Sequence, residues 1–206
     1  MRLFSIKPAY TLRGRKFLGI RGWSGKPTHP PLTDFPIVCY VLAGLFDLVA
    51  FITKDHEAGR DFFRAASFVI VTGLIVSLAT ALTGFWDWWK GLERDRSGPI
   101  GRAKHTQVWR TANWHMAVML TVTAIVLVDV LIRIVGWDEL TTAPVLVLSL
   151  LAALLVSFGA GYGGAMVFDY QFNVEPLKGS TVWDETEEDQ LPGRTPQPAP
   201  PPEGSA

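Results

Sequence analysis

Four side chains that can bind a metal or exchange a proton stand at the borders of apolar segments, far apart in the chain: His29, Asp34, Asp87 and His115. Two neutral imidazoles at facing helix ends can ligate a haem iron axially. Two imidazoles together with carboxylates can instead bind zinc or iron. A third interpretation needs no ligand. Asp34 then caps a helix, His29 pairs with Asp87, and His115 forms a hydrogen bond across helices.

A second group of ionisable residues, Asp47, Asp129 and Arg133, lies inside the apolar segments. Asp129 and Arg133 are four residues apart, so they share one face of a helix. A charge at bilayer depth costs about 2.5–3.5 kcal/mol on insertion scales, so each of these residues is expected to face a partner in the interior. We therefore predict that Asp47 meets Arg133. A structural ion pair and a proton or ion path both remain open.

The elements that position these residues are four long apolar segments, at residues 35–53, 65–89, 112–137 and 143–168. The chain has 206 residues, of which 49% are hydrophobic. Each segment reaches the roughly 20 residues that an α-helix needs to cross a bilayer. None alternates with the period of a strand, and a lone strand cannot satisfy its backbone in lipid. The sequence therefore predicts an all-α fold, an integral membrane four-helix bundle.

The chain divides into three regions, and it is polar outside the apolar segments. Residues 1–26 are basic and contain no apolar core of a signal peptide, residues 27–176 carry the four-helix transmembrane domain, and residues 177–206 are acidic and then proline-rich. Such a tail buries too little apolar surface to fold alone, so we predict that it is disordered.

Lys and Arg gather in the N-terminal segment and the second loop. The positive-inside rule then predicts a multi-pass protein of the bacterial inner membrane, with both termini in the cytoplasm.

Small residues at helical spacing predict how the helices pack. The second segment has Gly73, Ser77 and Ala81, and the fourth has Ser149, Ala153, Ser157, Gly161 and Ala165. Small residues let two backbones approach closely in a membrane, where lipid supplies no hydrophobic drive for association. We therefore expect close contacts between the second and fourth helices.

Several classes of protein are excluded or disfavoured. A single cysteine, Cys39, rules out a disulfide framework and a CxxC metal site. The chain has no nucleotide-binding, hydrolase or metalloprotease motif, so a familiar soluble enzyme class is not expected. The expected partners are the lipid bilayer and either a membrane protein or a second copy of the chain, with no nucleic acid.

The order of motifs resembles a family of uncharacterised bacterial membrane proteins, domain-of-unknown-function family 2231. The resemblance covers roughly residues 22–176. It is carried by an opening G-x-P-x-HP-x-L…FP stretch, a helix with an acid, a Gly and Asp at the end of the second helix, a third helix with His and Arg, and a closing GG. The matching residues are Gly25, Pro27, His29, Pro30, Leu32, Phe35, Pro36, Asp47, Thr83, Gly84, Asp87, His115, Arg133, Gly163, Gly164 and the stretch MVFDYQFNV.

The resemblance implies four membrane helices and a short strand-like piece after the GG pair, and the family has no established activity. Some members are joined to Rieske-type iron–sulfur domains, which implies a redox setting. This chain has Lys26, Met119 and Ala165 where many or some members have further potential ligands. The leading hypothesis is a non-catalytic accessory or scaffold subunit in a redox setting. The alternative is an electron carrier that binds haem b or a metal through His29 and His115, and a small transporter or proton conductor ranks lowest.

Overall fold

The computed structural model describes residues 20, 27–92, 107–136 and 140–173. The disordered tail predicted for residues 177–206, and all of the basic segment except residue 20, lie outside the described residues. The described chain forms four helices, α1 (His29–Ile52), α2 (Glu57–Gly91), α3 (Gln107–Val135) and α4 (Ala143–Phe168). All four are long and apolar enough to cross a membrane. The predicted all-α membrane bundle is therefore confirmed.

The helices extend beyond the apolar segments that predicted them. Only α4 has the bounds of its segment, while α1 begins six residues earlier than expected and α2 eight residues earlier. The 35 residues of α2 span about 52 Å, which exceeds the hydrocarbon thickness of about 30 Å. Hydropathy therefore located the membrane-embedded part of each helix but not its polar continuation.

The chain does not form the predicted strand-like piece after the GG pair within the described residues. Helix α4 continues to Phe168, and turns follow as far as Asn173. Gln171 and Asn173 have left-handed backbone angles, with φ of 52° and 56°. The Phe172 N–H returns to the Met166 carbonyl at 2.8 Å. The helix end is thus closed by local hydrogen bonds, and Phe172 packs against the cluster of Leu92, Ala112 and Met166.

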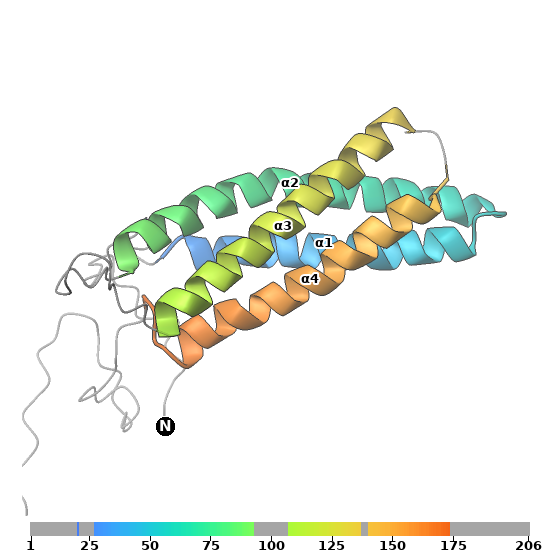
Figure 1. Ribbon diagram of the computed structural model, residues 1–206. Helices are drawn as coiled ribbons and strands as arrows, with labels where there is room; N and C mark the ends of the chain where they lie inside the picture. Colours follow the sequence, from blue (N-terminus) through green and yellow to red (C-terminus); the bar gives the residue numbers. More distant parts are fainter. Residues whose placement is uncertain (1–19, 21–26, 93–106, 137–139, 174–206) are drawn as a thin grey trace, which may run out of the picture.

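Each helix contacts two others, in the cyclic order α1, α2, α3, α4. Helices α1 and α3 lie diagonally opposite each other, as do α2 and α4, and within the described residues the backbones of either diagonal pair do not pack closely against each other. The start of α1, the end of α2, the start of α3 and the end of α4 all lie at one end of the bundle, on the left of Figure 1. Residues far apart in the sequence are thereby brought to the same level.

The predicted contact between the second and fourth helices is wrong. A Cβ added to Gly73 of α2 would stand 2.7 Å from the Cys39 Cβ of α1. A Cβ added to Gly44 of α1 would stand 3.2 Å from the Ser149 carbonyl oxygen and the Ala153 Cβ of α4. Helix α1 is therefore the common neighbour of α2 and α4.

The five small residues of α4 also fail to form one interface. Each step of four residues advances about 40° beyond a full turn, so five members sweep about 160° around the helix. Ser149 is buried, Ala153 and Ala165 are half-buried, and Ser157 and Gly161 are exposed. Ala81 of α2 is exposed as well. The buried face of α4 instead follows steps of three and four, which is typical of helices packed at small crossing angles.

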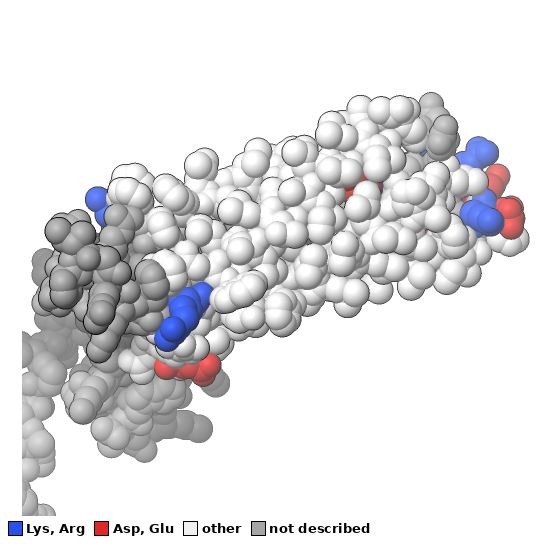
Figure 2. Space-filling view, viewed as in Figure 1, with Lys and Arg blue, Asp and Glu red and all other residues white. Residues whose placement is uncertain are grey.

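The buried positions form an apolar core in the middle of the bundle. Its members come from all four helices and are listed here: Tyr40, Ala43, Ile70, Val122, Val126, Val130, Ala152 and Val156. Many large apolar side chains point outward instead, such as Leu82 and Leu154, which are 71% and 70% exposed. Charged side chains gather near the two ends of the bundle, and the long middle of the face in Figure 2 is almost uncharged. This surface suits lipid rather than water.

Candidate functional site

The first histidine begins helix α1. His29 is the first residue of α1, and Pro30 and Pro31 complete its first turn. Prolines are tolerated there because the first backbone N–H groups of a helix have no intrahelical acceptor. The predicted cap by Asp34 is wrong, since Asp34 lies five residues inside the helix and is exposed. Thr28 occupies the capping position without a side-chain hydrogen bond.

His29 of α1 and His115 of α3 approach each other across the diagonal of the bundle. Their ring centroids are 6.5 Å apart and the ring planes are nearly perpendicular, at 83°. His29 Nδ1 lies 3.0 Å from the Thr80 carbonyl oxygen of α2. His115 Nδ1 lies 2.9 Å from the Gly159 carbonyl oxygen of α4. We call these two residues the histidine layer.

The hydrogen bonds fix the tautomer of both rings. A carbonyl oxygen only accepts, so Nδ1 must carry the hydrogen in each imidazole. The Nε2 atom of each neutral ring then keeps its lone pair. Histidines that bind metals usually donate their other N–H to a backbone carbonyl or a carboxylate in this way, which orients the ring. The histidine layer therefore has two oriented rings, each with a nitrogen that can serve as a ligand.

The two carboxylates predicted to join the histidines do not complete a metal site. Asp87 is buried, and its Oδ1 accepts the Ile20 N–H at 3.3 Å. Asp34 points to the exposed side of α1. No group of three or more potential ligands that could hold a metal ion occurs among the described residues. Of the four residues predicted to form a metal centre, His29, Asp34, Asp87 and His115, the structure therefore brings together only the two histidines. The predicted pairing of His29 with Asp87 is not seen either, since no hydrogen bond joins them in the described part of the chain.

The intramembrane charges meet at the opposite end of the bundle. Arg133 donates one N–H to Asp47 of α1 and others to Asp129, with Nε 3.0 Å from Asp129 Oδ1. Asp47 and Asp129 are fully buried and Arg133 is 1% exposed. We call these three residues the charge layer. Arg133 and Asp47 lie on the diagonal pair α3 and α1, as the two histidines do.

Neutral side chains complete the charge layer. The Arg133 NH1 group donates to Ser67 Oγ of α2 at 3.1 Å, and Thr141 Oγ1 lies 3.5 Å from Asp47 Oδ1. The guanidinium carbon also stands 5.4 Å from the Phe63 ring centroid. Each charged group thus has an opposite charge beside it, and Arg133 and Asp47 also have a neutral hydrogen-bonding or aromatic neighbour. This arrangement is what a buried ion pair requires for stability in a membrane.

The two layers are separated along the bundle. Asp47 and Arg133 each follow the histidine of the same helix by 18 positions (47 − 29 and 133 − 115), which is about 27 Å along a helix. The apolar core lies between the layers. Within it, the Tyr40 hydroxyl and Ser77 Oγ form a hydrogen bond of 2.6 Å. The layers are therefore independent sites on the same two helices.

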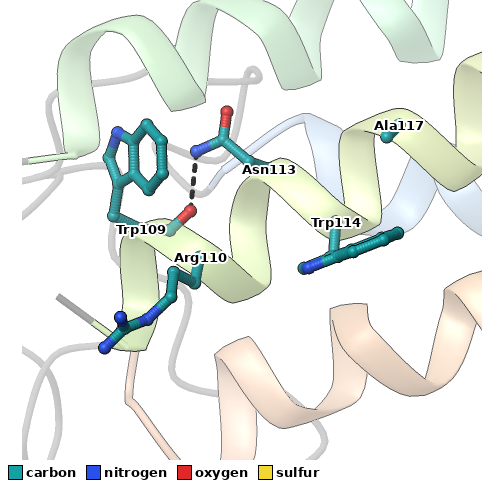
Figure 3. A pocket seen from close by; sticks show the side chains of 5 residues that line it. All are labelled: Trp109, Arg110, Asn113, Trp114 and Ala117. Carbon is teal, nitrogen blue, oxygen red and sulfur yellow. Dashed lines mark hydrogen bonds between the residues drawn. The ribbon is translucent and has the colours of Figure 1, made fainter. Parts of the chain in front are cut away.

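A hollow on the outer side of α3 lies near the histidine end of the bundle. It has a volume of about 240 Å³ and is lined by Trp109, Arg110, Asn113, Trp114 and Ala117, shown in Figure 3. Asn113 Nδ2 donates to the Trp109 carbonyl at 2.7 Å, the bond drawn in Figure 3. Arg110, Trp114 and Ala117 are exposed. The hollow is therefore part of the outer surface of the bundle.

The fold and this site define an integral membrane four-helix bundle with a pair of inward-facing histidines. A family model described as "Predicted membrane protein (DUF2231)" matches residues 25–176. The chain therefore belongs to this family of predicted membrane proteins, as the motif order indicated. Neither the curated proteins nor the solved structures contain a match.

Sequence reasoning missed the residues that hold the histidines in place. These are the carbonyl acceptors Thr80 and Gly159, whose hydrogen bonds a side-chain motif does not reveal. Gly84 and Gly163 are among the residues that match the family pattern. A usable signal was present in the equal spacing of His29 to Asp47 and of His115 to Arg133. That spacing indicates that α1 and α3 place their polar residues at the same two levels.

Proposed function

We propose that the protein is a membrane electron-transfer module that holds one b-type haem between His29 and His115. The observation that carries the proposal is the 6.5 Å separation of the two ring centroids. Two imidazoles bound on opposite sides of one metal, each with a metal–nitrogen distance of about 2.0 Å, have centroids about 6 Å apart. The two rings therefore stand at the spacing of a pair of axial ligands.

The number of ligands favours haem over a bare metal ion. Protein zinc sites usually use three or four protein ligands, and non-haem iron sites are typically held by two histidines and a carboxylate. Among the potential metal ligands of the described residues, only the two histidines come together in this layer. Haem iron receives four nitrogens from its own macrocycle and needs only axial ligands from the protein. Two oriented imidazoles are thus a complete set for haem and an incomplete one for zinc.

The proposed setting is a redox complex of the bacterial inner membrane. The histidine layer lies at the end of the bundle where α1 starts and α4 ends (Figure 1). The sequences next to this end carry most of the Lys and Arg of the chain. By the positive-inside rule this end faces the cytoplasm, with both termini on that side. The module would then exchange electrons close to the cytoplasmic face.

The test is the absorption spectrum and metal content of the protein purified in a mild detergent. We expect a Soret band that is lost in His29→Ala and in His115→Ala. His56→Ala is the matched control, because His56 is an exposed residue that precedes α2. A colourless and metal-free wild-type preparation from cells that make ample haem would contradict the proposal.

A second candidate is the non-catalytic accessory or scaffold subunit, and one observation favours it. Each histidine already joins two helices by a hydrogen bond, α1 to α2 and α3 to α4. The rings could therefore serve to brace the bundle without a ligand. This function predicts that a membrane protein partner or a second copy of the chain co-purifies after gentle extraction. Recovery of a colourless lone monomer would count against both candidates.

A transporter or proton conductor has the weakest support. Asp47, Asp129 and Arg133 are engaged with one another and with Ser67 and Thr141. An apolar core stands between them and the histidine layer, with the Tyr40–Ser77 pair as a polar step. This function predicts flux into liposomes that Asp47→Asn abolishes. Reconstituted protein that carries no ion or proton would exclude it.

A further inference from the structure

The two histidines are held by the same local arrangement on different helices. The Thr80 carbonyl that accepts from His29 lies four residues before Gly84, and the Gly159 carbonyl that accepts from His115 lies four residues before Gly163. In an α-helix the side chain at position i+4 lies over the preceding turn, beside the carbonyl of residue i. Glycine at i+4 leaves that carbonyl open to a donor from a neighbouring helix.

Each glycine also makes room for the ring that uses the carbonyl. A Cβ added to Gly84 would stand 2.5 Å from His29 Cε1, and a Cβ added to Gly163 would stand 3.3 Å from His115 Cε1. By contrast, a Cβ at Gly161, on the exposed side of α4, would meet nothing within 4 Å. A side chain at Gly84 or Gly163 therefore displaces or crowds a histidine, whereas one at Gly161 does not.

The likeness extends from the histidine layer to the charge layer. A shift of 86 residues takes Asp47 to Arg133, and the same shift takes His29 to His115. It also takes the buried positions of α1 at Pro36, Tyr40, Ala43 and Gly44 to the buried positions of α3 at Val122, Val126, Asp129 and Val130. The shift that takes Gly84 to Gly163 does the same for α2 and α4. It takes Ala66, Ile70, Gly73, Ser77, Thr80 and Asp87 to Val145, Ser149, Ala152, Val156, Gly159 and Met166, which are all buried.

We infer that the molecule consists of two equivalent helical hairpins, α1–α2 and α3–α4, and that each hairpin supplies one half of the histidine site. An approximate two-fold axis along the bundle relates the halves, since the cyclic order of the helices is preserved when α1 exchanges with α3 and α2 with α4. Each half-site has one histidine, one helix carbonyl and one glycine. The positioning residues are Thr80 and Gly84 in one half and Gly159 and Gly163 in the other.

Each half uses its histidine in the same way. Nδ1 is held by the partner helix of the same hairpin, which leaves the lone pair on Nε2. Each hairpin therefore supplies one ring of the same tautomer, with one nitrogen that can serve as a ligand. This inference rests on the hydrogen bonds and the buried pattern, and it holds whether or not the site takes haem.

The test is nitrogen NMR of protein labelled with ¹⁵N-histidine, with signals assigned from His29→Ala and His115→Ala. Imidazoles free in water favour the Nε2–H tautomer, so two rings in the Nδ1–H form are a specific signature of the half-sites. We expect Gly84→Ala to shift the His29 signals and leave those of His115 in place. Gly163→Ala should do the reverse, and Gly161→Ala, the control on the same helix, should change neither. A coloured preparation is measured after reduction, when low-spin iron is diamagnetic.

The outcomes separate this inference from the proposed function. Nδ1–H signals from both rings in a colourless preparation would exclude the haem proposal and support the inference of two half-sites. An Nε2–H form for either ring in the ligand-free protein would overturn the inference. The inference would also be overturned if Gly84→Ala and Gly163→Ala each shifted the NMR signals of both histidines to the same extent, because separate half-sites respond separately.

Discussion

The histidine layer and the charge layer lie on the same two diagonal helices but differ in how their polar groups are used. In the charge layer, Arg133 is bonded to Asp47, Asp129 and Ser67. In the histidine layer, each ring uses Nδ1 in a hydrogen bond and keeps Nε2 as a potential ligand. The charge layer has a partner for each charge, and the histidine layer keeps the lone pair of two Nε2 nitrogens.

This difference shows which buried polar groups in a membrane bundle are explained by stability and which need a functional explanation. A buried charge needs an opposite charge and hydrogen bonds to be tolerated at all, so an ion pair is explained by stability. A neutral imidazole in a bundle is costly to bury and gives only a modest hydrogen bond in return. The spacing of the two rings, which is that of axial ligands, is therefore the reason for proposing a ligand in this layer.

The largest expected effect comes from removing the cation of the charge layer. Arg133→Met leaves two buried carboxylates without their partner, and breaking a buried ion pair costs about 3–5 kcal/mol. We expect a large loss of thermal stability in detergent, followed by circular dichroism. The triple replacement of Asp47, Asp129 and Arg133 by Leu should lose less, because no charge is left unpaired. Equal stability of Arg133→Met and wild type would show that the layer is not a structural ion pair.

Transposing the charges should have a smaller effect and would sharpen the comparison. The variant with Ala43→Asp, Asp47→Arg, Asp129→Ala and Arg133→Asp moves each charge to the equivalent position of the other hairpin. We expect a loss of about 1–3 kcal/mol, because the charged pairs are remade while Ser67 and Thr141 keep their old places, so the two buried hydrogen bonds that they make are lost. Asp47→Arg alone should be far less stable. If the four-fold variant were no more stable than Asp47→Arg alone, the result would argue against equivalent hairpins.

The smallest effects are expected at the glycines beside the rings. Gly84→Ala should lower the unfolding midpoint, since overpacking typically costs about 1–3 kcal/mol and the better helix propensity of alanine offsets about 1 kcal/mol of that cost. Gly163→Ala should lower it less, because its added Cβ would be 3.3 Å from the ring rather than 2.5 Å. Gly161→Ala should keep or raise stability, since alanine is the better helix former. The order of the three midpoints in one detergent is the measurement, and a reversed order would contradict the packing described.

The helices and the identity of the polar residues could be predicted from the sequence. Length and hydropathy decide that Ala143–Phe168 crosses a bilayer, because a membrane requires about 20 apolar residues in a helix. The cost of a buried charge likewise led to the expectation that Arg133 lies beside Asp47. Both inferences depend on local composition and on one general cost, so they need no knowledge of which helices are neighbours.

The arrangement of the helices could not be predicted in the same way. Small residues such as Gly73 show that a close neighbour exists but not which one, and the neighbour is α1 rather than α4. The spacing of four in α4 predicts one face, but this row of small residues leaves the buried side of the helix after Ala153. The partners of the histidines are backbone carbonyls, which every residue has. Only the three-dimensional structure selects Thr80 and Gly159 as the acceptors.

Haem binding is tested most directly by the reduced-minus-oxidised absorption spectrum of the wild-type protein, recorded with its iron content. We predict about one iron per chain, a Soret band, and a sharp visible band that appears on reduction. His29→Ala and His115→Ala should each remove these bands, while Asp34→Asn, which changes an exposed acid of α1, should retain them. A wild-type protein without iron, or bands that survive the loss of either histidine, would contradict the claim that the histidine layer is a haem site.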